Sequence, residues 1–317
     1  MAENRLADHV PAEHRAADGV DPERSPIFVV GSSRSGTTLL RMMLCAHPRI
    51  HLTMESSFYL WAGLYTRWRD QDGFPPYYVR SFSYRWLQLD PGPILAELPR
   101  PFGFDDRKRM FAAVMRHQAS RNGKVRFGDK TPSHSASLGA IFRDFPDARV
   151  IRMVRDPREV VSSLVKMPWA SRSLITASIV TDSERRQVRK FKDRILEVKL
   201  SALIAEPKGT MEQVLAHVGE DWSDQVLDHA NHRPPNDQLP PMPWFESAAR
   251  PPTSTIARSK AVDPVEVRLI EALNRASMRD QGLAPASLPV EPSRFAVWWR
   301  WARDWPEFLR STGAAIR

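Results

Sequence analysis

The sequence predicts an α/β fold in which a central parallel β-sheet is flanked by helices. Short apolar runs alternate with segments of helical spacing, and these runs lie at residues 26–30, 125–128, 150–154 and 195–200. Strands and helices that alternate in this way form βαβ units, which build parallel sheets. Two of the connections carry helix-start signals, since a Gly-bounded loop follows the first run and Asp156-Pro157 follows the third.

The loop after the first run has the composition of a phosphate-binding site. Residues 26–40 read Pro-Ile-Phe-Val-Val-Gly-Ser-Ser-Arg-Ser-Gly-Thr-Thr-Leu-Leu, so Gly31 and Gly36 are spaced as in a P-loop. Backbone N–H groups of such a loop and of the following helix N-terminus bind an anion. Nucleoside triphosphatases carry Lys after the second glycine, whereas this chain has Thr37 there and Arg34 inside the loop. We therefore expect an anion other than a magnesium-bound triphosphate.

Three segments resemble, in the same order, the motifs of one enzyme family. Residues 27–40 resemble the 5′-phosphosulfate-binding loop of sulfotransferases that use 3′-phosphoadenosine 5′-phosphosulfate (PAPS), in which Arg or Lys precedes Ser-Gly-Thr-Thr. Residues 148–164 resemble the family's 3′-phosphate-binding element, and residues 127–132, Phe-Gly-Asp-Lys-Thr-Pro, resemble the segment between the two. The resemblance implies a P-loop nucleotide-kinase-like sulfotransferase fold, with PAPS as co-substrate and adenosine 3′,5′-bisphosphate (PAP) as product. The nucleotide-binding residues that it implies are Ser33, Arg34, Ser35, Gly36, Thr37, Thr38, Arg155 and Ser163.

The residues of the second motif favour an anion site even without the resemblance. Arg155 follows an apolar run typical of a buried parallel strand, and open α/β sheets bind ligands at the carboxyl ends of their strands. Ser163 lies about two turns into the next helix, where it can share a phosphate with Arg155. The alternative is that Arg155-Asp156-Pro157 forms only a helix cap with a surface ion pair.

Sulfuryl transfer requires stabilisation of charge on the transferring group, by analogy with phosphoryl transfer. Arg34, the loop N–H groups and the hydroxyl groups of Thr37 and Thr38 suit this task. The resemblance implies that Lys130 is a second cation, which stabilises the bridging oxygen or the transferring group. A sulfonate carries less charge than a phosphoryl group, so no metal ion is required.

A general base must take the proton of the acceptor, and two residues are candidates. Glu55 matches the place of the catalytic Glu in a subset of the family that includes tyrosine-directed sulfotransferases, and we expect it to be the base. His134 is the competing candidate, because other sulfotransferases use a His near a Lys such as Lys130. Read alone, Glu55 also fits an acidic residue in the first turn of a helix.

The chain length of 317 residues favours one domain with extensions. We expect a disordered arm at residues 1–24, a sulfotransferase domain at 25–285 with an insertion or lid at 70–104, and a linker with an amphipathic helix at 286–317. No stretch approaches the roughly 20 apolar residues of a membrane span, and residues 1–24 lack an apolar signal core, which predicts a cytoplasmic protein. Cys45, the single cysteine, excludes an intramolecular disulfide and is expected to be buried.

The remaining elements follow from apolar periodicity. Helices are expected over residues 55–69, 105–121, 133–144, 207–217 and 264–279. Prolines break regular structure over residues 233–253, and the position of residues 253–260 resembles the family's late loop that closes over the nucleotide. Arg258 and Lys260 are therefore candidates for contact with the 3′-phosphate.

The formal charge of +9, from 46 Lys and Arg against 37 Asp and Glu, fits a protein that binds a polyanionic nucleotide. The basic residues of 184–194 are expected to form a solvated helix face, and no nucleic-acid-binding signature is evident. Residues 295–317 place Trp298, Trp301 and Trp305 at helical spacing. This helix either packs on the domain or on a second subunit, or lies at a membrane surface and brings the enzyme to a lipid-like acceptor.

Together the motifs predict sulfuryl transfer from PAPS to a hydroxyl or amine group. The sequence does not specify the acceptor, which we expect to be a small molecule, a lipid or a glycan, with a peptide as a further choice. Two alternatives come from other classes. A P-loop kinase would bind its nucleotide with magnesium, and a non-catalytic nucleotide-binding or membrane-associated protein would turn over no acceptor.

Overall fold

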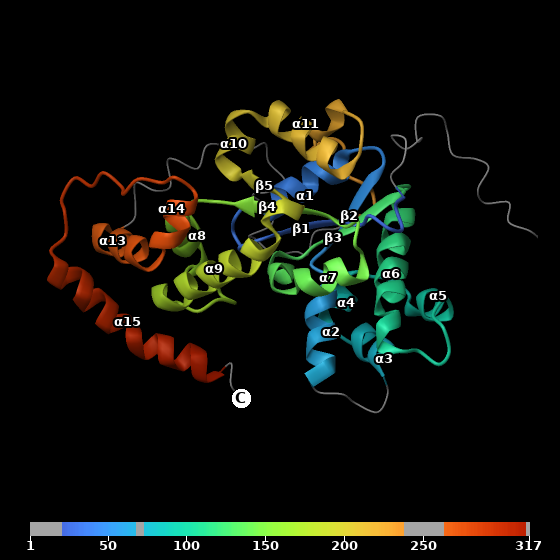
Figure 1. The fold of residues 1–317 in the computed structure, drawn as a ribbon, viewed down its shortest axis with the longest axis horizontal. Helices are drawn as coiled ribbons and strands as arrows, with labels where there is room; N and C mark the ends of the chain where they lie inside the picture. The colour runs from blue at the N-terminus through green and yellow to red at the C-terminus, as the bar shows by residue number, and fades with distance from the viewer. Residues whose placement is uncertain (1–20, 68–72, 238–262, 315–317) are drawn as a thin grey trace, which may run out of the picture.

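A five-stranded parallel sheet lies at the centre of the protein (Figure 1). The computed structural model describes residues 21–67, 73–237 and 263–314. In the order in which they pair, the strands are β2 (Ile50–Met54), β3 (Arg126–Lys130), β1 (Ile27–Gly31), β4 (Arg149–Val154) and β5 (Ile195–Lys199). The predicted α/β fold with a central parallel sheet is therefore confirmed, and β1, with the loop expected to bind phosphate, occupies the middle of the sheet.

Helices cover both faces of the sheet. On one face lie α1 (Thr37–Ala46), α10 (Leu200–Ala205) and α11 (Pro207–Val218), and on the other lie α2 (Phe58–Arg67), α6 (Arg107–Arg121) and α7 (Leu138–Asp144). Because successive side chains of a strand point to opposite faces, β1 serves both cores. Ile27 and Val29 pack on the side of α1, whereas Phe28 and Val30 pack on the side of α6.

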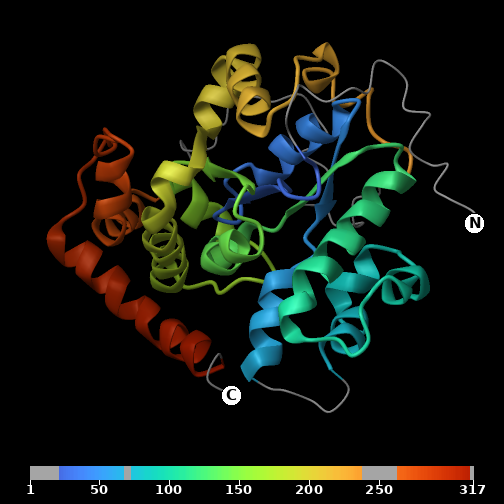
Figure 2. The ribbon, with the colours of Figure 1, turned by 45° about the vertical axis from the view of Figure 1, so that its right-hand side comes forward.

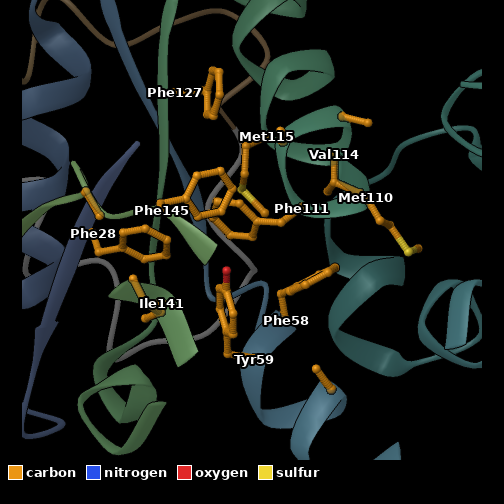
Figure 3. Packing of buried hydrophobic residues seen from close by; sticks show 14 of the residues in the cluster. Phe28, Phe58, Tyr59, Met110, Phe111, Val114, Met115, Phe127, Ile141 and Phe145 are labelled. Carbon is orange, nitrogen blue, oxygen red and sulfur yellow. The ribbon is translucent and has the colours of Figure 1, made fainter. Parts of the chain in front are cut away.

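The core on the α6 side is rich in aromatic rings (Figure 3). The rings of Phe28 and Phe111 stack with their centroids 5.1 Å apart, and Phe58 meets Phe111 edge to face at 5.4 Å. Such pairs add stability beyond the area that they bury. They fix α2 and α6 against the sheet, and with them the loop that precedes α2.

A third group of helices extends the fold beyond β4 (Figure 2). It contains α8 (Pro157–Leu164), α9 (Leu174–Val188), α13 (Pro264–Leu273), α14 (Arg275–Asp280) and α15 (Arg294–Ala314). Apolar side chains of α8, α9 and α13 form one cluster, against which Val297 and Trp301 of α15 pack. This cluster holds α8, which carries Ser163, in a fixed position.

The first half of the chain departs from the expected elements at β2 and α2. Residues 50–54 form strand β2, which was not expected, and α2 begins at Phe58 instead of Glu55. Glu55 therefore lies in the loop directly after β2 and not in the first turn of a helix. The strand expected at 125–128 is shifted to 126–130, which brings Lys130 into β3.

Later elements depart from expectation in smaller ways. Residues 133–144 begin as a 3₁₀ helix (Pro132–Ser137) before α7, and the helix expected over 264–279 is split into α13 and α14 at Asn274. The basic stretch 184–194 is not one helix, because α9 ends at Val188 and a 3₁₀ turn (Arg189–Arg194) leads into β5. Cys45 is buried, as expected.

The segment expected as an insertion or lid contains three short helices. They are α3 (Phe74–Val79), α4 (Phe82–Trp86) and α5 (Pro91–Ala96). Phe74, Tyr78, Tyr84 and Ile94 of these helices are buried in the aromatic core on the α6 side. Residues 74–96 are thus part of the body of the fold.

Candidate active site

The loop between β1 and α1 can be formed only with glycine at its two ends. A Cβ atom at Gly31 would lie 2.6 Å from the carbonyl oxygen of Met153, and one at Gly36 would lie 2.7 Å from Leu200. Both residues have positive φ, at 142° and 99°, which disfavours other residue types. Arg34 also has a left-handed backbone, with φ of 74°. Such strain in a non-glycine residue is typical of functional loops.

The N-terminus of α1 has the features of an anion-binding site. Gly36 is the N-cap and provides no side-chain cap, and the first turn of α1 contains no acidic residue. The N–H groups of this turn and the positive end of the helix dipole therefore face the loop. The hydroxyl oxygen of Ser35 is buried and has no partner among the described residues. These features fit the phosphosulfate group that the sequence predicts, and Ser33, Ser35, Gly36, Thr37 and Thr38 all belong to this loop and turn.

The two predicted anion-binding arginines are in direct contact. Arg155 Nη1 donates a hydrogen bond to the carbonyl oxygen of Arg34 at 2.8 Å, and Arg34 Nε donates to Ser163 Oγ at 3.1 Å. Arg155 Nε is also bonded to Glu159 at 2.6 Å, and its side chain is only 11% exposed. Arg155 is therefore hydrogen-bonded to the loop between β1 and α1, a contact beyond that of a surface ion pair beside a helix cap.

A cavity of about 910 Å³ opens beside these residues. Arg34, Arg155 and Ser163 line it on one side, and residues 284–289 line it on the other. Lys166 of the segment after α8 adds another cation to its wall. This volume lies in the usual range of ligand pockets, and it is large enough for a nucleotide.

Glu55 and Lys130 meet at the carboxyl ends of β2 and β3. Glu55 Oε1 lies 2.6 Å from Lys130 Nζ, and Nζ also lies 3.4 Å from the hydroxyl oxygen of Thr38. Lys130 is fully buried, which lowers its pKa, and the neighbouring carboxylate of Glu55 offsets part of that effect. Glu55 keeps 29% of its side chain exposed and has positive φ of 49°. The structure thus brings Glu55, Lys130 and Thr38 together beside the loop.

His134 lies on the other face of the sheet. Lys130 is paired with Val29 in the sheet and Asp129 with Phe28, so their side chains point to opposite faces. His134 is fully buried on the Asp129 side, with Nδ1 3.0 Å from Asp129 Oδ2 and Nε2 accepting a hydrogen bond from the backbone of Tyr59 at 3.2 Å. The structure therefore does not bring His134 to the loop.

Asp129 is a structural carboxylate that fixes the loop after β2. Burial alone would raise its pKa, but His134 and hydrogen bonds from Thr131 and Ser56 outweigh burial and hold the pKa below the usual range. The backbone N–H of Ser56 donates to Asp129 Oδ1 at 3.1 Å. Because Ser56 follows Glu55 directly, this bond positions the residue that carries the candidate base.

Sequence reasoning missed one residue of the loop's surroundings. Glu184 of α9 is buried, accepts a hydrogen bond from the hydroxyl group of Ser32, and lies 3.7 Å from Arg152. Burial raises the pKa of Glu184 to about 7, and Arg152 opposes the rise. No local pattern marks this residue, because Ser32 and Glu184 are far apart in the chain. The expected solvated helix face therefore contains one inward carboxylate.

Two of the predicted residues, Arg258 and Lys260, lie outside the described residues, so the structure gives no position for them. Within residues 21–67, 73–237 and 263–314, no group of three or more His, Cys, Asp and Glu side chains could hold a metal ion. The same residues contain no helix with the length and apolar composition that a membrane span requires.

Comparison with known proteins gives a family match over all five strands of the sheet. Residues 26–224 match the model of the sulfotransferase family. Protein-tyrosine sulfotransferase A of Caenorhabditis elegans is 23% identical over 241 residues, which cover 71% of this chain and 57% of that protein. Protein-tyrosine sulfotransferase 1 of Danio rerio is 26% identical over 226 residues, which cover 64% of this chain and 55% of that protein. The chain spans just over half the length of these two relatives.

Among solved structures, the sulfotransferase domain of the olefin synthase from Synechococcus PCC 7002 aligns with a TM-score of 0.49 and 16% identity. The alignment covers 88% of this chain and 95% of that domain. Sulfotransferase STF9 of Mycobacterium avium aligns with a TM-score of 0.46 over 84% of this chain and 78% of that protein, at 14% identity.

Proposed function

This chain belongs to the sulfotransferase family, and we propose that it transfers a sulfuryl group from PAPS to the hydroxyl group of an acceptor. The contact between Arg155 and the carbonyl oxygen of Arg34 carries this proposal. It joins the loop expected to bind the 5′-phosphosulfate to the residue expected to bind the 3′-phosphate. Few nucleotides other than PAPS and PAP require both sites at once.

The donor would lie across the Arg34–Arg155 contact. Its 5′-phosphosulfate would accept hydrogen bonds from the loop N–H groups, from Thr37 and from Thr38, at the positive end of the α1 dipole. Its 3′-phosphate would bind Arg155 and Ser163 at the mouth of the cavity of about 910 Å³. An arginine suits this task because its planar donors match phosphate oxygens.

Glu55 would act as the general base. It accepts the proton of the acceptor hydroxyl as the oxygen forms a bond to sulfur, and the bond between sulfur and the 5′-phosphate oxygen breaks in line. Lys130 stabilises the charge that develops on that bridging oxygen, and Arg34 with the loop N–H groups stabilises the sulfonate oxygens. The ion pair of 2.6 Å between Glu55 and Lys130 supports this pairing of base and cation.

The relatives indicate which acceptor to test first. Relatives described as protein-tyrosine sulfotransferases make a tyrosyl or other phenolic hydroxyl the first acceptor to test. Small alcohols, glycans and lipids follow, since the sequence leaves the acceptor open. A P-loop kinase is disfavoured by Thr37, which stands where such an enzyme carries Lys.

The first experiment measures which nucleotide stabilises the protein. In a thermal-shift assay we expect PAP to raise the melting temperature more than AMP, and ATP with magnesium to have the smallest effect. PAPS is then offered with a tyrosyl peptide, a phenol, a sugar and a lipid alcohol, and mass spectrometry detects the product that gains a sulfuryl group. Preference for ATP with magnesium would contradict the proposal, and PAP binding without turnover of any acceptor would favour a binding protein.

A further inference from the structure

The C-terminal helix α15 has one face fixed against the domain. Trp301 packs on the cluster formed by α8, α9 and α13. Asp304 is buried and caps the start of α9, where it accepts hydrogen bonds from the hydroxyl group of Ser173 at 2.6 Å and from the backbone of Ile175 at 2.9 Å. These contacts set the rotation of α15 about its own axis, so its opposite face is held outward.

That outward face is apolar over the length of the helix. Helical spacing places Phe295, Trp298, Trp299 and Leu309 on the side opposite Asp304, and Trp305 at the edge of that side. The four aromatic side chains of this set are between 40% and 70% exposed. We call these five residues the outer face of α15.

The charges beside the outer face are basic. Arg303 and Arg310 flank it along one side and are exposed. Of the two acidic residues of α15, Asp304 is buried in the cap of α9, and Glu307 is paired with Arg310 at 2.9 Å. The formal charge of the whole chain is +9. An anionic surface would therefore be attracted to this side of the molecule.

The exposed area distinguishes a bilayer from a second protein subunit. With about 200 Å² for each aromatic side chain, the exposed parts of Phe295, Trp298, Trp299 and Trp305 sum to about 400 Å². A stable protein interface buries about 800 Å² on each partner, so a protein partner would also have to cover polar surface around this face, whereas a bilayer interface takes up the apolar side chains alone. Trp residues beside Arg residues are instead typical of helices that lie in the membrane interface.

We propose that α15 docks the protein onto the surface of a bilayer that contains anionic lipids, with the outer face in the interface and Arg303 at the headgroups. The helix would lie in the plane of the membrane, because its inner face remains bound to α9 and α13. Docking of this kind requires no nucleotide. It stands or falls independently of the sulfotransferase reaction proposed above.

The test is flotation of the full chain with lipid vesicles. The wild-type protein should float with vesicles of phosphatidylcholine and phosphatidylglycerol, and much less with phosphatidylcholine alone. Trp298→Ser combined with Trp299→Ser should lower the floating fraction by about tenfold or more, since two interfacial anchors are lost. Arg303→Glu should weaken flotation most at low salt, where charge attraction is least screened.

Trp86→Ala is the matched control. Trp86 is an exposed tryptophan of α4 that lines a small pocket with His51 of the edge strand β2, away from α15. This variant should float like the wild type, and an unchanged melting temperature in each variant shows that it is folded. The proposal is overturned if the wild type stays in the soluble fraction with both vesicles, or if the double Trp variant floats as well as the wild type. A dimer in light scattering that the double Trp variant dissociates, without flotation of the wild type, would assign the face to a second subunit instead.

Discussion

Glu55 Oε1 and Lys130 Nζ lie 2.6 Å apart at the carboxyl ends of two adjacent strands, β2 and β3. The charge of Lys130 is stabilised by Glu55, because Lys130 is fully buried and Glu55 is its closest anion. The pair places a proton acceptor and a cation on the same side of the phosphate-binding loop. In the proposed reaction, Glu55 would act as base on the acceptor while Lys130 would stabilise the leaving oxygen.

Glu55→Gln should abolish most turnover without loss of the nucleotide. The amide cannot take a proton, so we expect sulfuryl transfer to fall by about 10²- to 10⁴-fold. PAP affinity, measured by calorimetry, should stay near that of the wild type, because the proposed nucleotide contacts come from the loop N–H groups, Arg155 and Ser163 and not from Glu55. Glu97→Gln, on the surface of the segment after α5, is the control and should retain full activity. Unchanged turnover in Glu55→Gln would remove Glu55 from the role of base.

Arg155→Ala should remove the preference for a 3′-phosphate. Loss of one charge-assisted contact costs about 1.5–3 kcal/mol, so PAP should bind roughly 10- to 100-fold more weakly. AMP affinity should fall less, since AMP has no group for this site. Titration calorimetry of PAP and AMP measures both, and Arg189→Ala, an exposed arginine of the 3₁₀ turn after α9, is the control. Equal losses of affinity for PAP and AMP would contradict the proposal that Arg155 binds the 3′-phosphate.

Asp237→Ala should destabilise the fold strongly. Arg41 of α1 is buried, donates to the carbonyl oxygen of Leu52 at 2.7 Å, and forms an ion pair with Asp237 at 3.0 Å through Nη1. Removing the carboxylate leaves a buried charge without its partner, which costs about 3–5 kcal/mol of unfolding free energy. Urea denaturation measures this change.

The control for that prediction is an exposed ion pair, Arg24 and Asp147, at 3.3 Å. Asp147→Ala should change the unfolding free energy by less than about 1 kcal/mol, because solvent screens exposed pairs. Similar losses in Asp237→Ala and Asp147→Ala would show that burial does not govern the strength of the first pair.

Glu184 should make stability depend on pH. Its pKa is about 7 in the folded protein and 4.5 in an ordinary setting, so the folded state binds more protons between these two values. Stability therefore falls as pH rises through this window and stays low above it. Glu184→Gln is neutral at every pH and keeps a polar group for Ser32. Its melting temperature should exceed that of the wild type by a margin that grows from about pH 5 to about pH 8.

Glu197→Gln is the matched control for Glu184. Glu197 is an exposed carboxylate that also pairs with Arg152, at 2.5 Å. The negative charge of Glu197 helps to raise the pKa of Glu184, so Glu197→Gln should keep the fall of melting temperature with pH, because Glu184 is still present, and shift that fall to lower pH. A constant margin for Glu184→Gln would mean that Glu184 is ionised throughout and that burial does not control its proton.

The parallel sheet and the loop were predictable because each depends on local residue order. The β1 loop needs glycine at both ends, and Arg155 follows an apolar strand, so both signals lie within a few residues. β2 was missed although Ile50, Leu52 and Met54 alternate with His51 and Thr53, which is the pattern of a strand with one polar face. The run is only five residues long, and the fold buries its polar face as well, which the sequence pattern does not predict.

Long-range pairs explain most of the remaining differences. Ser32 meets Glu184, and Arg41 meets Asp237, across large separations in sequence that no periodicity reports. Whether Glu55 or His134 lies beside the loop depends on which face of β3 each side chain approaches. The register of β3 against β1 separates them, since Lys130 and Asp129 point to opposite faces.

The bond from Arg155 to the carbonyl oxygen of Arg34 also limits how donor specificity could be redesigned or could evolve. A substitution of Arg155 that accommodates another nucleotide also removes the hydrogen bond from its guanidinium group to Arg34, which supports the left-handed backbone of that residue. Selectivity for the nucleotide and the shape of the loop therefore depend on the same residue. A switch to a donor without a 3′ group would require compensating changes in both segments, which makes single-step drift toward other nucleotides an unfavourable route.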